Sequence, residues 1–192
     1  MSLIDIESDV PVFAVETAVV HEGKVLLIRW ANVRGWSFPG GYVKPNESVL
    51  QAAVRETLEM TGVEVELVRL LGVYSRPNWR KAGHHQVSFV ARPIAGVPRL
   101  SPLIIDVGYF APDNLPTVLF PFYRQRVKDA LATDSDPVVR VQNYAWPSED
   151  ELRELDPYLD DLEADRIVGP FRQWWDRWTH EVETGTETLG KK

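Results

Sequence analysis

The sequence predicts an α+β fold in which one mixed β-sheet is covered on its faces by helices. Two β-rich segments come first, and an amphipathic helical segment follows them. Three more β-rich segments and a second amphipathic segment complete the order β-β-α-β-β-β-α. Apolar residues alternate or run together in the strand segments and recur at helical spacing in the helices, which separates the two kinds of element.

The first two predicted strands are residues 11–20 and 24–30, and they are joined by His21-Glu-Gly-Lys24, a hairpin-like turn signal. Residues 31–46 are rich in Gly and Pro and are therefore expected to form a loop. The three later strands are predicted from further β-rich runs, at residues 63–75, 84–96 and 104–112.

The first helix is predicted to start at Asn46, a residue type that caps helices, and to end at Gly62. Six of its residues recur at helical spacing and are expected to face the core: Leu50, Ala53, Val54, Thr57, Leu58 and Thr61. Residues 119–132 have the pattern of the second amphipathic helix.

A polar break at residues 133–137 divides the chain into a domain of residues 1–133 and a C-terminal extension of residues 134–192. The extension begins with a strand-like segment and is otherwise expected to be mainly helical. Trp174, Trp175 and Trp178 form an apolar stripe in it. This stripe is expected to pack either on the domain or against a second subunit in a homodimer, because tryptophan favours interfaces.

The composition excludes several classes of function. A net charge of −7 argues against binding a nucleic acid polymer or an anionic membrane, which requires a basic surface. The absence of cysteine excludes disulfides, thiol catalysis and Cys-ligated zinc. The acidic first residues do not resemble a signal peptide, and no apolar run approaches the length of a membrane span. These features predict a cytoplasmic protein.

Two acids in the first helix form a candidate metal site. Glu56 and Glu59 are three residues apart and project to one side of a helix, and position 60 is expected to project there too. A hard cation with oxygen ligands relieves the repulsion between such acids. Arg55 is placed to brace Glu59, and glycine at positions 40 and 41 lets a backbone carbonyl approach the same cation. The alternative is that these charges form a solvated helix face.

This segment resembles the signature of the Nudix hydrolases, the family of MutT-like pyrophosphohydrolases. The residues that match at the family's spacing are Gly41, Glu47, Arg55, Glu56, Glu59, Gly62 and Val63. Two positions depart from it: Thr57 replaces an aliphatic residue, and Met60 replaces a glutamate that is a principal metal ligand in the family. The resemblance covers residue 12 to about residue 132. It implies a Nudix fold and hydrolysis of the pyrophosphate bond in a nucleoside diphosphate linked to another group.

The resemblance also implies roles for individual residues. Arg55, Glu56 and Glu59 would be catalytic, and the Gly40 carbonyl with the two glutamates would bind Mg²⁺ or Mn²⁺. Asp106 is the first candidate for a further acid from outside the motif, with a surface acid as the alternative. Four residues are expected to bind the small nucleotide substrate near the family's binding cleft: Trp36, Tyr74, Arg76 and His84. The alternative is a packing or strand residue for Trp36, Tyr74 and His84, and a solvent-facing charge for Arg76.

Met60 leaves a second hypothesis open. Methionine is soft and neutral and is a poor ligand for Mg²⁺ or Mn²⁺. The chain is therefore either a working hydrolase or a Nudix-fold protein with impaired catalysis. In the second case it would bind a nucleotide or act as a regulatory protein.

Overall fold

The computed structural model describes residues 10–31, 35–78, 82–133, 136–143 and 186–188. Its helices are α1 (Val49–Thr61) and α2 (Pro121–Leu131). Its strands are β1 (Val12–His21), β2 (Lys24–Trp30), β3 (Trp36–Ser37), β4 (Gly40–Tyr42), β5 (Val63–Arg76), β6 (His84–Gly96), β7 (Ile104–Phe110), β8 (Val138–Gln142) and β9 (Thr186–Thr188).

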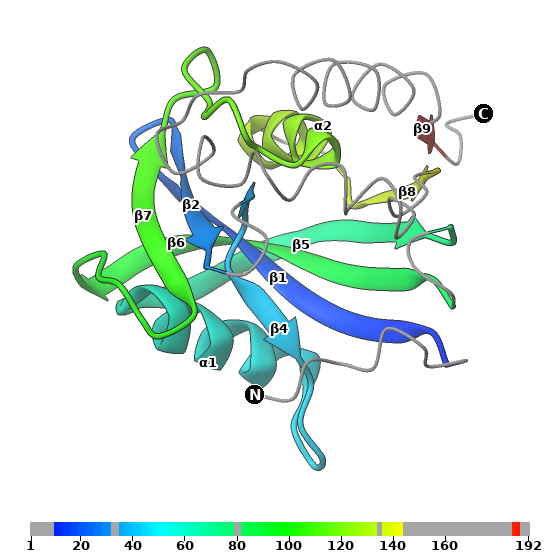
Figure 1. Cartoon of the computed structure of the whole chain (residues 1–192), viewed down its shortest axis with the longest axis horizontal. Helices are drawn as coiled ribbons and strands as arrows, with labels where there is room; N and C mark the ends of the chain where they lie inside the picture. The colour runs from blue at the N-terminus through cyan, green and yellow to red at the C-terminus, as the bar shows by residue number, and fades with distance from the viewer. Residues whose placement is uncertain (1–9, 32–34, 79–81, 134–135, 144–185, 189–192) are drawn as a thin grey trace, which may run out of the picture.

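The strands are hydrogen-bonded in the order β3-β2-β1-β6-β5-β8-β9, with β4 added to β1 and β7 added to β2 (Figure 1). β1 runs parallel to β6, and β5 runs antiparallel to β6 and parallel to β8. The sheet is therefore mixed, as predicted. The turn between β1 and β2 has positive φ at Glu22 and Gly23, the backbone that a tight hairpin requires.

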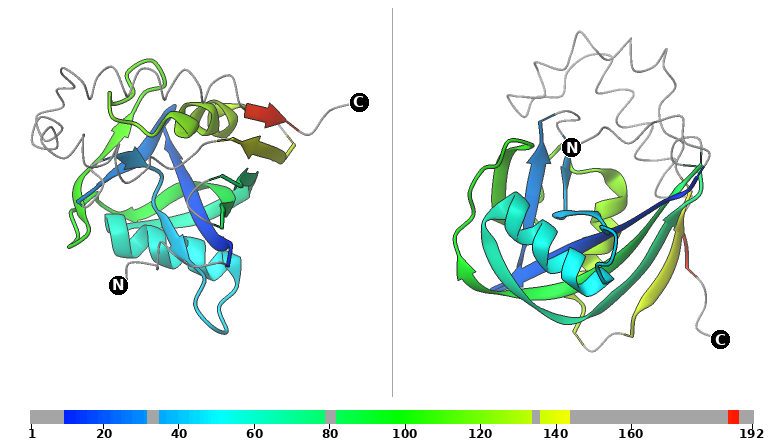
Figure 2. Two further views of the ribbon diagram at one scale, coloured as in Figure 1. Left: turned by 45° about the vertical axis from the view of Figure 1, so that its right-hand side comes forward. Right: turned by 90° about the horizontal axis from the view of Figure 1, so that it is seen from below.

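The two helices lie on opposite faces of the sheet, as Figures 1 and 2 show. Successive side chains of β1 point to opposite faces of the sheet, so this strand packs against both helices. Val15 packs with Ala52 and Ala53 of α1 in one apolar cluster. Ala18, of the opposite parity, packs with α2 in the largest cluster, which also contains Trp36 and Tyr74. The chain thus forms the α+β sandwich that the sequence predicts.

The predicted strands and the second helix agree with the structure to within a few residues at each end. The sequence prediction missed two short strands, β3 and β4, inside residues 31–46. Both are too short to show alternation, and their hydrogen bonds to β2 and β1 are long-range. β4 matters most for function, because it carries Gly40 and Gly41 to β1 and, as shown below, to α1.

Two predictions about the first helix were wrong. Ser48, rather than Asn46, is the N-cap; Asn46 has a φ of 63° and lies in the preceding turn. Leu50 and Leu58 are exposed, at 53% and 38%, whereas Met60 is buried. The reason is that the face of α1 that rests on β1, β4 and β5 is rotated away from the two leucines and toward Ala52, Glu56 and Met60, which are buried.

The C-terminal extension lies mostly outside the described residues, which include only its strands β8 and β9. The tryptophan stripe is among the residues outside them, so its packing stays a prediction. In the described part of the chain, no helix combines the length and the apolar character needed to cross a membrane.

Candidate active site

Helix α1 is fixed at both ends by its own sequence. The Ser48 hydroxyl accepts a hydrogen bond from the Gln51 backbone N–H, and the Gln51 side chain accepts one from the Ser48 N–H, which is a capping box. At the other end Gly62 adopts a left-handed φ of 72° and donates its N–H to the Leu58 carbonyl. These caps fix where the helix begins and ends.

The two glycines of β4 lie against the sheet and the helix at very short range. A Cβ added to Gly40 would lie 2.3 Å from the Val15 carbonyl oxygen. A Cβ added to Gly41 would lie 2.4 Å from the carboxyl carbon of Glu56. A side chain at position 40 would clash with the backbone of β1, and one at position 41 would displace the Glu56 carboxylate, so the double glycine brings the backbone of β4 directly to that carboxylate.

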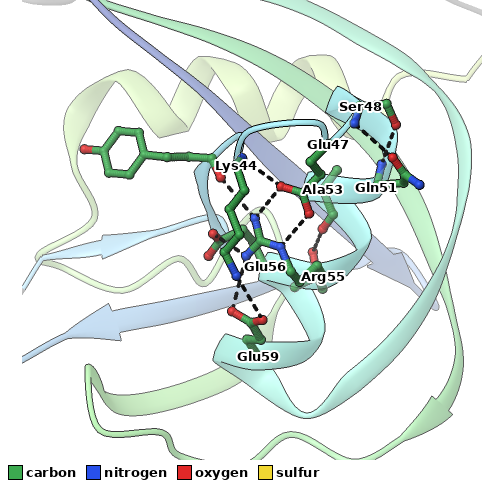
Figure 3. A network of polar contacts seen from close by, with 10 residues as sticks. Lys44, Glu47, Ser48, Gln51, Ala53, Arg55, Glu56 and Glu59 are labelled. Carbon is green, nitrogen blue, oxygen red and sulfur yellow. Dashed lines mark hydrogen bonds and ion pairs between the residues drawn. The ribbon is translucent and has the colours of Figure 1, made fainter. Parts of the chain in front are cut away.

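Arg55 is the centre of a network of three carboxylates (Figure 3). It donates to Glu47 from Nε at 2.6 Å and from Nη2 at 2.8 Å, and to the Tyr42 carbonyl at 3.0 Å. Its Nη1 donates to Glu56 Oε1 at 2.7 Å and to Glu59 Oε2 at 3.2 Å. One guanidinium therefore positions both of the predicted cation-binding acids.

The same network shifts two pKa values. The hydrogen bonds from Arg55, followed by the one from the Lys44 backbone N–H, lower the pKa of Glu47 to about 2. The hydrogen bond to Glu47 is the largest cause that raises the pKa of Arg55. Because both Glu47 oxygens accept these bonds, Glu47 braces Arg55 and the segment before α1.

Glu56 and Glu59 fit a hard divalent cation in geometry and in chemistry. Their carboxylates share one donor nitrogen and therefore lie on the same side of the helix. The Glu56 side chain is 10% exposed and that of Glu59 is 54% exposed, so one acid of the pair is buried and the other lies at the surface. Carboxylate oxygens are the ligands that Mg²⁺ and Mn²⁺ prefer, with water and phosphate oxygens completing the shell.

Met60 does not project beside these two acids, contrary to the expectation from its spacing. It is 4% exposed and packs in an apolar cluster with Ile28 of β2 and Ile104 of β7. Its side chain joins the helix to these two strands. Position 60 thus contributes packing where the resembled signature has a glutamate ligand.

Asp106 lies on β7, in register with Arg29 of β2, and is exposed. Its Oδ1 accepts a hydrogen bond from the Val107 N–H at 2.8 Å. Among the described residues, no group of three or more His, Asp or Glu side chains is arranged to hold a metal ion. The structure thus brings together Glu56 and Glu59 but does not bring Asp106 to them.

The four residues predicted to bind substrate belong to the α2 side of the sheet. Trp36 is 2% exposed and packs edge-on against Phe110, and Tyr74 is fully buried and donates to Asp129 at 2.8 Å. Burial is the largest cause that raises the pKa of Tyr74. Neither ring has a free face on which a base could stack, so both are core residues in this structure.

Arg76 and His84 are neighbours on paired strands at the end of β5 and the start of β6. The Arg76 Nη2 contacts His84 Nδ1 and donates to Gln86 Oε1 at 3.1 Å. His84 is partly exposed, whereas Arg76 is 4% exposed. Of the four predicted substrate residues, His84 is the one with an accessible side chain.

Sequence reasoning missed a buried polar network next to this pair. Glu16 of β1 and Arg126 of α2 are both fully buried, and Arg126 Nη1 donates to Glu16 Oε1 at 2.6 Å. Gln86 and Gln142 accept further bonds from Arg126, and Tyr123 donates to Glu16 at 2.8 Å. The signal was present in the sequence, as a glutamate inside the apolar run of residues 12–20.

Comparison with known proteins decides the family. A family model for the NUDIX domain matches residues 13–123. The chain belongs to this family. An ADP-ribose pyrophosphatase from Methanocaldococcus jannaschii is 33% identical over 63% of this chain and 73% of its own length. A MutT-like protein from Streptomyces ambofaciens is 32% identical over 63% and 79%, respectively.

Solved structures agree. The crystal structure of a MutT NUDIX hydrolase from Burkholderia pseudomallei covers 62% of this chain and 97% of its own, with 29% identity and a TM-score of 0.57. This Nudix protein is accordingly an enzyme that acts on phosphoric anhydrides. Nudix hydrolases generally use divalent metal ions, and their substrates are small nucleotides.

Proposed function

We propose that this Nudix enzyme hydrolyses the pyrophosphate bond of a nucleoside diphosphate linked to a further group, with Mg²⁺ or Mn²⁺ as cofactor. The observation that carries the proposal is the convergence of Glu56 and Glu59 on one nitrogen of Arg55, next to the glycine backbone of β4. A buried and an exposed carboxylate on one side of a helix would hold a divalent cation through their oxygens.

The residues have distinct roles in this proposal. Glu47 and Arg55 position the site, since Arg55 holds the other two acids and Glu47 holds Arg55. Glu56 and Glu59 bind the cation, which neutralises charge on the diphosphate and lowers the pKa of water when it is bound. Glu59 is also the proposed base, because its exposed carboxylate is open to an attacking water.

The nucleoside is proposed to extend from β4 toward the α2 side of the sheet, where His84 is accessible. The position of β4 supports this route. Gly41 lies against Glu56 on the α1 side of the sheet, and Gly40 lies against the backbone of Glu16, whose side chain faces α2. The buried Arg76 would act by positioning His84 rather than by meeting phosphate.

A hydrolysis screen of ADP-ribose, nucleotide sugars and 8-oxo-dGTP with Mg²⁺ and with Mn²⁺ tests the proposal. We expect turnover of at least one compound, and a loss of about 10²-fold or more in kcat for Glu56→Gln. Glu22→Gln is the matched control, because Glu22 is an exposed acid in the β1–β2 turn. Equal loss in both variants would contradict the assigned site.

A thermal-shift screen of the same compounds separates catalysis from binding alone. Any ligand that binds only the folded state raises the melting temperature. Stabilisation by a nucleotide without turnover under any metal condition would contradict hydrolysis and indicate a nucleotide-binding protein.

A further inference from the structure

Lys44 adds a positive charge to the carboxylate network. It lies in the segment between β4 and α1, and its Nζ is 3.7 Å from Glu59 Oε1 (Figure 3). Its side chain is 58% exposed. Its backbone N–H, rather than its side chain, donates to Glu47 at 2.9 Å. The ammonium group is therefore free to move without releasing the segment that holds the site together.

The charges of this network nearly cancel. The residues drawn in Figure 3 include three carboxylates, of Glu47, Glu56 and Glu59, and two cations, of Lys44 and Arg55. One net negative charge remains to attract a divalent ion. Met60 supplies no further charge and is turned into the apolar cluster with Ile28 and Ile104.

We propose that Lys44 couples binding of the cation to binding of the diphosphate, so that the two enter the site together. Without substrate, the ammonium pairs with Glu59 and opposes the arrival of a divalent cation. When a cation arrives with a diphosphate, the ammonium moves to the phosphate oxygens and releases Glu59 to the cation. This inference rests on the proposed function and adds that the cation and the diphosphate bind together.

The chemistry of lysine suits this exchange. Its ammonium is a compact charge on a flexible four-carbon stem, and it binds phosphate as a point charge. The rigid fork of Arg55, which makes bonds to all three carboxylates, cannot leave without dismantling the site. Lys44 is thus the mobile cation of the pair, and Arg55 is the fixed one.

The first measurement uses Mn²⁺ alone, with the free ion followed by electron paramagnetic resonance. We expect Lys44→Met to bind Mn²⁺ about fivefold more tightly than the wild-type protein, because a repelling charge a few ångströms away is removed. Lys44→Arg keeps the charge and should stay within about twofold of wild type. Lys128→Met is the matched control, because Lys128 is an exposed lysine on α2, on the opposite face of the sheet.

The second measurement repeats the titration in the presence of α,β-methylene-ADP, a diphosphate that resists hydrolysis. Here Lys44→Met should bind the Mn²⁺ complex about fivefold more weakly than wild type, since the phosphate loses its partner. The opposite signs of the two effects are the signature of coupling. A lysine that merely stabilised the loop would change both affinities in the same direction.

The outcomes separate this inference from the proposed function. Unchanged Mn²⁺ affinity in Lys44→Met, or a change of the same sign with and without the nucleotide, overturns the role of Lys44 even if the enzyme turns over normally. Failure of every hydrolysis assay would overturn the proposed function, and the two Mn²⁺ titrations would still decide the inference about Lys44.

Discussion

Replacing Met60 with glutamate would place an acid where the family signature has one, and the structure predicts that the change destabilises this protein. Met60 is 4% exposed, among Ile28, Ile104 and the partly buried Trp30 and Val107. A carboxylate in this cluster has apolar neighbours. In the absence of metal, Met60→Glu should therefore unfold more easily than the wild-type protein.

The expected magnitude has two parts. Losing the burial of a methionine side chain costs about 1.5–3 kcal/mol. A carboxylate held in apolar surroundings has a raised pKa, and each unit of that shift costs about 1.4 kcal/mol near neutral pH. A shift of about two units gives a total of roughly 4–6 kcal/mol at pH 7, a large share of the stability of an ordinary domain.

Denaturant unfolding at pH 7 and pH 5 measures both parts. The folded-state pKa of the new carboxyl lies above its unfolded value, so the electrostatic penalty is small near pH 4 and grows as pH rises. Met60→Gln is the matched control; its penalty should be smaller and independent of pH. A Met60→Glu protein as stable as Met60→Gln at pH 7 would refute the buried carboxylate. Stabilisation by Mn²⁺ greater than that of wild type would show that the side chain has turned toward the cation.

Two further predictions concern the polar networks. Glu47→Gln should lower the melting temperature at pH 6, and its difference from wild type should shrink as pH falls from about 4.5 to 2. The reason is that the stability contributed by the lowered pKa of Glu47 is complete above the unfolded-state pKa and is lost as pH falls through the folded-state pKa. A constant difference in thermal scans across this window would contradict it. Arg126→Met should cost about 3–5 kcal/mol in denaturant unfolding, because it leaves the Glu16 carboxylate buried without its cation. Adding Glu16→Gln should recover part of that loss, whereas strictly additive costs would count against direct coupling.

The elements of the fold were predictable because their signals are local. Strands β1, β2, β5 and β6 are long and rich in β-branched residues, and Gly62 marks the end of α1. Strands β3 and β4 were not predictable, because their two or three residues become strands only through pairing with β2 and β1. The pairing of Glu16 with Arg126 was not predictable either, because Arg126 lies 110 positions away along the chain.

The directions of the site's side chains were predictable where the residue spacing along helix α1 determines them. Glu56 and Glu59 do share one side of α1, and Arg55 does contact Glu59. Spacing could not show that Arg55 also binds Glu47 and the Tyr42 carbonyl, because the path of the segment before α1 sets those contacts. The resemblance to the Nudix family placed Trp36 and Tyr74 near the site but could not show that α2 and its neighbours bury them.

The direction of Met60 follows from helix geometry once the covered face is known. A helix turns about 100° per residue, so Glu59 lies about 60° to one side of Glu56 and Met60 about 40° to the other. In this structure the first side faces solvent and the second faces β2 and β7, so Glu59 is exposed whereas Glu56 and Met60 are buried. A rotation of α1 that moved position 60 out from between β2 and β7 would also move Glu59 from its present place beside Lys44. The apolar contacts of Met60 with Ile28 and Ile104 oppose that rotation, so the methionine helps to hold Glu59 where Lys44 can reach it.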